Sequence, residues 1–145
     1  MQEYVGEIDY GQSLRQMIKD GNYARVVNDI TSKYFPTKGK GKEKVKLELY
    51  RFDDRTVTGT EALELLDEAG YRPANLVELL AFGKTFPDEG REFPILAIGQ
   101  SWRDSFGDLV VPYLCGVDDG RGLSVLWLAS GFDPRYRFLV VRKDG

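Results

Sequence analysis

The sequence contains no histidine and only one cysteine among its 145 residues. Without histidine, the chain cannot build a Ser–His or Cys–His nucleophile pair, a histidine general base or a histidine-ligated zinc site. A single cysteine can neither close an internal disulfide nor supply a thiolate cluster for zinc. Carboxylate, lysine, tyrosine and serine–lysine chemistry are the catalytic options that remain.

Long apolar runs are also missing. No stretch approaches the roughly 18 apolar residues that a membrane span needs, and the opening residues MQEYVGEIDY have neither the basic nor the apolar region of a secretory signal. The net charge of −3 offers no overall attraction to nucleic acid or anionic lipid. We therefore expect a soluble, cytoplasmic protein that binds neither nucleic acid nor membranes.

Phosphate-binding and nucleophile-elbow motifs are absent as well, since the sequence contains no G-x-G-x-x-G, G-x-x-x-x-G-K-[ST] or G-x-S-x-G. Adjacent acidic pairs occur at Asp53-Asp54, Asp88-Glu89 and Asp118-Asp119. Neighbouring side chains diverge, and none of these pairs has the alternating ligand spacing of a calcium-binding loop. We predict no cofactor and no metal site, with Ca²⁺ at Asp118/Asp119 as the disfavoured alternative.

The N-terminal third contains weak element signals followed by one clear strand. Alternation over residues 4–10 predicts a short edge strand, and apolar spacing over 14–18 predicts a helix that Gly21 ends. The lysine-rich run 38–46 lacks aromatic residues for base stacking and predicts a solvated hairpin or linker. From residue 45, VKLELYRF alternates and predicts a half-buried strand, with Lys46, Glu48 and Tyr50 on its outer face.

Two helices are predicted in the middle of the chain, each with a capping box at its start. Thr58 and Glu61 open the first, and Asn75 and Glu78 open the second. Pro73 stands between them and prevents the first helix from continuing. The two glutamates are thus interpreted as caps rather than as catalytic groups.

The C-terminal third predicts strands separated by short turns. The runs 93–99, 109–115, 123–129 and 136–142 are strongly apolar, and their separators are rich in Gly, Asp, Ser and Pro. Short separators predict antiparallel neighbours. Pro112 has no N–H for a sheet and predicts an edge strand or a bulge.

The segment CGVDDGRG, residues 115–122, predicts a tight hairpin in which Asp119 and Gly120 adopt left-handed conformations. Cys115 ends an apolar strand without a neighbouring base, so we interpret it as a small buried hydrophobe rather than a nucleophile.

The candidate binding residues lie on the loops around these strands, where aromatic and charged side chains gather. Trp, Tyr and Arg provide much of the energy at recognition surfaces, and loops on a rigid sheet are their usual place. Phe106 and, on an intervening strand, Trp127 add to the aromatic content, although any one of these rings could instead close the core. The predicted ligand-binding residues are Trp102, Arg103, Asp104, Leu128, Ser130, Phe132, Asp133, Arg135 and Tyr136.

The segment GYRPANLVELL, residues 70–80, resembles the Gly-Tyr/Trp-Arg-Leu-Pro-Thr-x-x-Glu segment that enters the second helix of C-type-lectin-like domains. These domains include formylglycine-generating-enzyme-like proteins and the variable proteins of diversity-generating retroelements. Tyr71, Arg72 and Glu78 match in register, and Asn75 stands at the position of the capping threonine. The chain also resembles small proteins of candidate-phylum bacteria.

The resemblance implies an α+β, C-type-lectin-like fold with two helices packed on a small twisted antiparallel sheet over residues 45–145. Residues 1–44 would form a strand–helix extension packed on it. Pro73 and Ala74 replace the Leu-Pro pair, the calcium-ligating motifs of sugar-binding lectins are missing, and the catalytic cysteine pair is reduced to Cys115. The resemblance therefore implies neither calcium-dependent sugar binding nor formylglycine chemistry.

The expected function is non-enzymatic recognition of a protein or other macromolecular ligand through the C-terminal loops, which retroelement-diversified proteins vary. Two alternatives stay open at this point. One is a carboxylate- or lysine-dependent enzyme for a small polar substrate, with Asp118 and Asp119 at its pocket; a strongly raised carboxylate pKa would favour it. The other is an accessory structural protein without a ligand.

Overall fold

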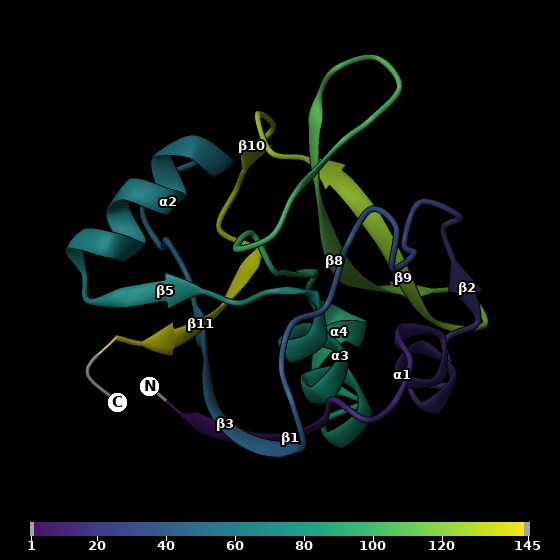
Figure 1. The fold of residues 1–145 in the computed structure, drawn as a ribbon. Coiled ribbons are helices and arrows are strands. Elements are labelled where there is room, and N and C mark those ends of the chain that lie inside the picture. The colour runs from purple at the N-terminus through teal and green to yellow at the C-terminus, as the bar shows by residue number, and fades with distance from the viewer. Residues whose placement is uncertain (1, 144–145) are drawn as a thin grey trace.

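The computed structural model describes residues 2–143 and shows an α+β protein with a mixed sheet and four helices (Figure 1). The N-terminal part comprises β1 (Glu3–Asp9), α1 (Leu14–Asp20), β2 (Arg25–Val26), β3 (Lys42–Tyr50), β4 (Val57–Thr58) and α2 (Gly59–Glu68). The middle comprises β5 (Tyr71–Pro73), α3 (Leu76–Thr85), α4 (Glu89–Glu92), β6 (Ile95–Leu96) and β7 (Trp102–Arg103). The C-terminal part comprises β8 (Leu109–Val117), β9 (Gly120–Trp127), β10 (Gly131–Phe132) and β11 (Arg137–Arg142).

The main sheet has the strand order β1-β3-β11-β6-β8-β9-β2. In addition, β5 pairs with β11 and β7 pairs with β8. The prediction of an antiparallel sheet is wrong at two places, because β11 runs parallel to β6 and β2 runs parallel to β9. The short separators do produce the antiparallel β8–β9 hairpin. Separator length carries no information about β11 and β6, which become neighbours through a long excursion of the chain.

The lysine-rich run becomes part of the sheet earlier than predicted. β3 begins at Lys42 rather than Val45 and pairs with β1 along seven residues. Lys42, Lys44 and Lys46 stand opposite Asp9, Glu7 and Val5. The boundary drawn at residue 44 therefore falls inside a strand, and the residues before it supply β1 and α1 to the main core.

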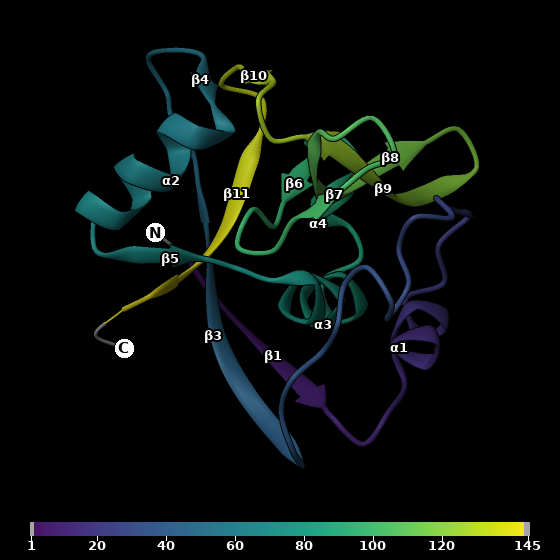
Figure 2. The same ribbon diagram turned by 45° about the horizontal axis from the view of Figure 1, so that its top comes forward.

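Two clusters of buried residues lie on opposite faces of the sheet. α3 covers one face, and all eight of its residues from Leu76 to Gly83 are buried. α2 covers the other face, as Figure 2 shows from a turned viewpoint. Alternate residues of β11 divide between the clusters, Leu139 facing α3 and Phe138 facing the α2 side. The near-continuous apolar pattern of the last strand follows from this covering of both faces.

Glu48 was expected on the solvent face of β3, and that prediction is wrong. Its exposure is only 4%, and the side chains that contact it come from β5 and β11. The guanidinium of Arg142 donates to the Glu48 carboxylate at 2.7 Å, and the Tyr71 hydroxyl lies 3.4 Å from its other oxygen. These contacts offset the cost of burying the charge.

Pro112 lies in an interior strand, flanked by β9 on one side and by β6 and β7 on the other. Its carbonyl accepts from the Ala97 N–H at 3.0 Å, which places its ring nitrogen on the same side. β6 ends at Leu96, and β7 pairs with β8 only at Val110 and Leu109, so the missing N–H of Pro112 falls in the gap between these two short strands. The break between β6 and β7 thus accommodates the proline in an interior strand, as an edge position or a bulge would.

The local signals are confirmed more closely. Both capping boxes form, with Thr58 and Asn75 each accepting from the third helical residue and Glu61 and Glu78 each accepting from the cap backbone. The hairpin also forms, but only Gly120, with φ of +143°, has a positive φ there. Asp119 was predicted to share this conformation and does not.

Candidate functional site

An open groove of about 510 Å³ lies where β7, β8 and β9 end, and it contains three of the predicted binding residues. We call it the Trp127 groove. It is lined by Thr60, Arg103, Gly107, Asp108, Leu109, Trp127, Leu128, Ala129 and Ser130. Arg103, Leu128 and Ser130 were predicted from the sequence, whereas Trp127 was left out of the predicted set.

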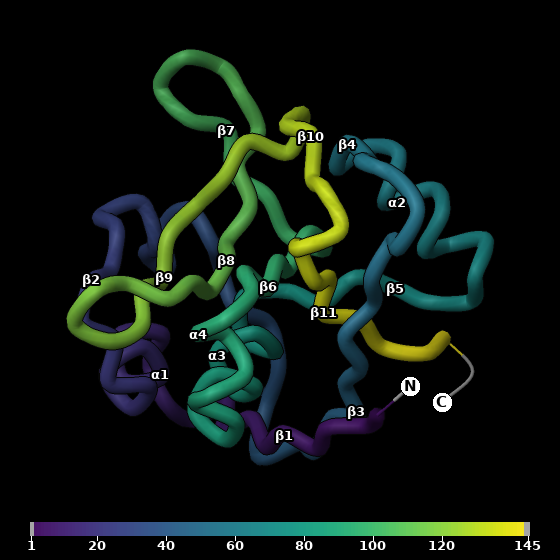
Figure 3. The backbone as a smooth tube through the Cα atoms, turned by 180° about the vertical axis from the view of Figure 1, so that it is seen from behind, coloured from purple at the N-terminus to yellow at the C-terminus, as the bar shows by residue number. Residues whose placement is uncertain are grey.

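The loop between β7 and β8 forms one wall of the groove and projects from the molecule (Figure 3). Asp104 orders this loop from within. Its carboxylate accepts from the N–H groups of Phe106 and Asp108 at 3.0 and 2.9 Å, and its own N–H donates to the Asp108 carbonyl. Arg103 donates to the Gly107 carbonyl and closes the turn. Asp104, predicted to contact ligand, therefore positions the loop.

Phe106 sits near the tip of this ordered loop, and 88% of its surface is exposed. A phenylalanine in that position contributes nothing to the core. In the sequence, its exposure is indicated by its position among polar loop residues, without the periodic apolar spacing that predicts burial.

Trp102 and Trp127 stand on either side of Val110 in neighbouring strands, so they share one face of the sheet. Tyr34 stacks on Trp102, with ring centroids 4.0 Å apart and planes at 25°, which leaves Trp102 half-buried. Nothing among the described residues covers Trp127 in this way, and 57% of its surface is exposed. The exposure of the two tryptophans therefore differs because Tyr34, from an earlier segment of the chain, stacks on Trp102 and not on Trp127. The residues next to each tryptophan in the sequence do not reveal this difference.

The second predicted loop divides into a buried part and an exposed part. Phe132 is 1% exposed and packs edge-on against Tyr136 and Phe138, at centroid distances of 5.1 and 5.9 Å. Tyr136 is half-buried against the same cluster. Phe132 was predicted to offer contact area to a ligand, but burial makes it a core residue.

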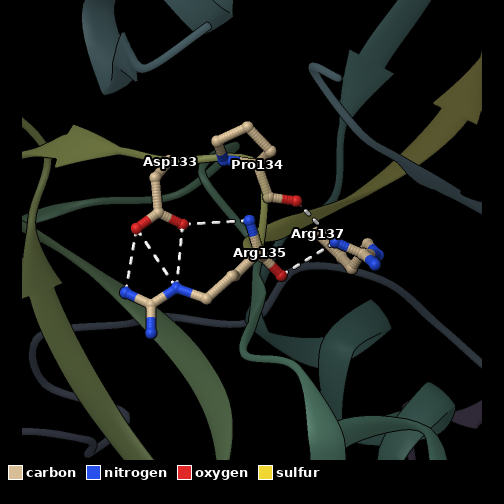
Figure 4. Close-up of polar contacts among 4 residues, drawn as sticks. All are labelled: Asp133, Pro134, Arg135 and Arg137. Atoms are coloured by element: carbon tan, nitrogen blue, oxygen red, sulfur yellow. Dashed lines mark hydrogen bonds and ion pairs between the residues drawn. The ribbon is translucent and has the colours of Figure 1, made fainter. Parts of the chain in front are cut away.

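Asp133 and Arg135 form a compact exposed turn around Pro134 (Figure 4). Arg135 donates from its guanidinium to Asp133 at 2.8 Å and from its backbone N–H at 2.9 Å. The Arg137 guanidinium donates to the carbonyls of Pro134 and Arg135 and fixes the turn from behind. The charges of Asp133 and Arg135 are therefore satisfied by each other.

The hydrogen bonds from Arg135 hold the pKa of the Asp133 carboxyl below its ordinary value. The turn thus stabilises the ionised form of Asp133. Its contribution to the free energy of unfolding is fully present above the ordinary pKa of an aspartate and is lost as pH falls through the lowered pKa of Asp133. We expect Arg135→Ala to raise the pKa of Asp133, measured by the pH dependence of its carboxyl carbon shift in NMR. Arg25→Ala, which removes a partner of Asp119 instead, is the control. An unchanged Asp133 pKa in Arg135→Ala would contradict this account.

The carboxyl pKa shifts run opposite to the direction that a general acid near neutral pH needs. Where a carboxyl pKa is shifted, at Asp20, Glu61 and Asp133, hydrogen bonds lower it. Burial raises the pKa of the half-buried Cys115 thiol, which disfavours the reactive thiolate. Within residues 2–143, no three Asp, Glu or Cys side chains come together as metal ligands.

The segment that resembles C-type-lectin-like domains has clear local roles. Arg72, on β5, makes a two-pronged ion pair with Glu78 of α3 at 2.9 and 2.8 Å. Glu78 is 3% exposed and also accepts from the Asn75 N–H. These residues fix the angle at which β5 leads into α3.

Comparison with family models, curated proteins and solved structures finds no match. Within the described residues, no helix is both long and apolar enough to cross a membrane. A function is therefore inferred from the geometry of the Trp127 groove.

Proposed function

We propose that this chain is a non-enzymatic binding module that recognises a protein or other macromolecular ligand through the Trp127 groove. The carrying observation is the exposure of two large aromatic side chains, Trp127 in the groove and Phe106 on the loop whose residues Gly107 and Asp108 line it. The finer part of the proposal is that the scaffold is C-type-lectin-like and that its C-terminal loops are diversified by a retroelement.

The groove combines the features of a recognition surface. Trp127 offers a large rigid ring, Leu109 and Leu128 supply apolar floor, and Arg103 and Ser130 supply polar groups at the rim. Aromatic rings flanked by polar side chains are typical of binding hot spots.

A macromolecular ligand suits the shape of this site better than a small substrate. The groove is open, and one of its walls is a projecting loop ordered by Asp104. A rigid projecting loop can reach into a partner without losing conformational entropy on binding. Small substrates are instead held in enclosed pockets that bury most of their surface.

The proposal is tested by selecting ligands from a displayed library of random peptides against the immobilised chain. Affinities are then compared between wild type and variants. We expect Trp127→Ala and Phe106→Ala each to weaken the selected peptides by about thirtyfold, because each removes a buried aromatic anchor. Val26→Ala truncates an exposed apolar residue on β2, away from the groove, and is the matched control.

Fluorescence gives a second readout in a Trp102→Phe background, where Trp127 is the only tryptophan. Peptide binding should shift its emission to shorter wavelength as the ring leaves water. Selected peptides that bind the Trp127→Ala and Phe106→Ala variants as tightly as wild type would overturn the proposal. A reverse transcriptase gene beside this gene, with a template repeat matching its 3′ end, would test the diversification.

A further inference from the structure

β1 forms one margin of the main sheet and has an unpaired outer side. It pairs with β3 in an unbroken register of seven residues, from Glu3 to Asp9. Within residues 2–143, no strand pairs with its other side. Figure 2 shows β1 beside β3 and below α3. The opposite margin of the sheet ends in β2, which is only two residues long.

The register determines which backbone groups point outward. The Tyr10 N–H donates to the Gly41 carbonyl at 2.8 Å, in the pair that extends the β1–β3 register by one position. Bonded and non-bonded pairs alternate in an antiparallel ladder, so the even-numbered residues of β1 bond to β3. The N–H and C=O groups of Glu3, Val5 and Glu7 therefore face the open side.

The side chains of these same residues lie on the solvent face of the sheet. Glu3, Val5 and Glu7 are exposed, with Val5 at 47%, while Tyr4, Gly6 and Ile8 between them are buried. The solvent face of β1 is thus an acidic row with an apolar residue at its centre. β3 already shows the matching chemistry, since it places Lys44 opposite Glu7.

A cavity of about 230 Å³ opens at the end of this edge, between β1, α1 and α3. Met17, Val77 and Leu80 give it apolar walls, and Glu7, Asp9 and Asp20 bring three carboxylates to it, with Lys42 and Lys84 also present. Such a cavity accommodates the aliphatic stem of a lysine or arginine whose charged end meets the carboxylates.

We propose that the open edge of β1 binds an extended, basic segment of a partner protein, which adds to the sheet as a further strand. Basic side chains of that segment would stand opposite Glu3 and Glu7, with an apolar residue opposite Val5. A second copy of this chain is a poor occupant, because antiparallel pairing centred on Val5 would place Glu3 of one copy against Glu7 of the other. Main-chain hydrogen bonds would provide affinity and the acidic row would select the sequence.

The probe is a fluorescein-labelled peptide of sequence Thr-Lys-Thr-Val-Thr-Lys-Thr, acetylated and amidated, whose Lys, Val and Lys face Glu7, Val5 and Glu3. Binding is measured by fluorescence anisotropy. A methyl group on the central valine nitrogen removes a donor that faces β1. We expect it to weaken binding at least about tenfold, a loss of about 1.4 kcal/mol. The same methyl on the preceding threonine points away from β1 and should leave affinity nearly unchanged.

A matched pair of protein variants tests the same edge from the other side. Val5→Pro removes one outward N–H, and proline is tolerated on edge strands where the N–H faces solvent. It should weaken the peptide by about tenfold or more, whereas Val5→Ala, which keeps the N–H, should change the affinity by less than about threefold. Should Val5→Pro fail to fold, the two methylated peptides still decide the question on wild-type protein.

Three results would overturn the proposal. Equal binding of the two methylated peptides would show that no strand is added. Equal binding of a peptide with glutamate in place of lysine would remove the acidic row from recognition. A dimer that sedimentation detects in wild type and that Val5→Pro dissociates would make a second copy the occupant. Trp127→Ala should leave peptide binding at β1 unchanged, so the test of the β1 edge is independent of the test of the Trp127 groove.

Discussion

Replacing Arg121 by alanine is expected to lower the free energy of unfolding by about 3 kcal/mol, because it strips a buried cation from two helix ends. Arg121 is the second residue of β9, just after the hairpin turn, and is only 6% exposed. Its guanidinium donates to the carbonyl of Gly83 at 2.7 Å and to the carbonyl of Gly21. Gly83 lies in the last turn of α3, and Gly21 is the C-cap of α1.

The C-terminal carbonyls of a helix carry partial negative charge and have no partner within the helix. Arg121 satisfies one such carbonyl on each of two helices, and the Tyr23 ring lies 4.8 Å from the guanidinium carbon. None of the ion pairs within residues 2–143 involves Arg121. The charge is therefore accommodated by helix ends and an aromatic face instead of a carboxylate.

Chemical denaturation monitored by circular dichroism measures this effect. Arg121→Lys should recover part of the loss, because one ammonium can reach one carbonyl but lacks the fork that spans two. The control is Arg25→Ala, at an exposed arginine 3.9 Å from Asp119, which should change stability by less than about 0.5 kcal/mol. If Arg121→Ala were as stable as Arg25→Ala, Arg121 would not be what holds α1 and α3 to the hairpin.

The elements that local chemistry specifies were predictable from the sequence. Thr58 and Asn75 start helices because a side-chain oxygen and a glutamate three positions later satisfy N–H groups within the same turn. The β8–β9 hairpin likewise depends on two apolar runs and the turn residues between them. None of these features needs information from a distant segment.

Three of the mispredicted features depend on distant segments. Glu48 fits the outward half of an alternating strand, and only the contacts of Tyr71 and Arg142, from β5 and β11, make its position interior. Pro112 fits an edge strand, and only the gap between β6 and β7 makes an interior place tolerable. The parallel pairing of β11 with β6 depends on the path of the whole C-terminal third.

The same limit explains the candidate site. Arg103, Leu128 and Ser130 were selected for their loop positions, and the structure places them in one groove because β7, β8 and β9 are neighbours. Aromatic character could not separate Trp127 from Phe132, since exposure depends on what lies over each ring. Phe132 is covered by the cluster around Phe138, and Trp127 is left bare.

Phe132→Ala is expected to cost about 4 kcal/mol of unfolding free energy, the largest effect of any substitution in the second loop. The ring is 1% exposed and touches Tyr136 and Phe138 edge-on, so its removal loses apolar burial and leaves a cavity that β10 and its partner β4 cannot fill without shifting. Arg135→Ala, at the exposed end of the same loop, should change stability by less than about 0.5 kcal/mol. Denaturant titration of the two variants beside wild type measures both values. Near-equal stabilities would return Phe132 to the surface and reopen the second loop as a binding site. The expected gap between the variants would show that the second loop contributes its aromatic ring to the core, whereas the ring of Trp127 in the groove is exposed.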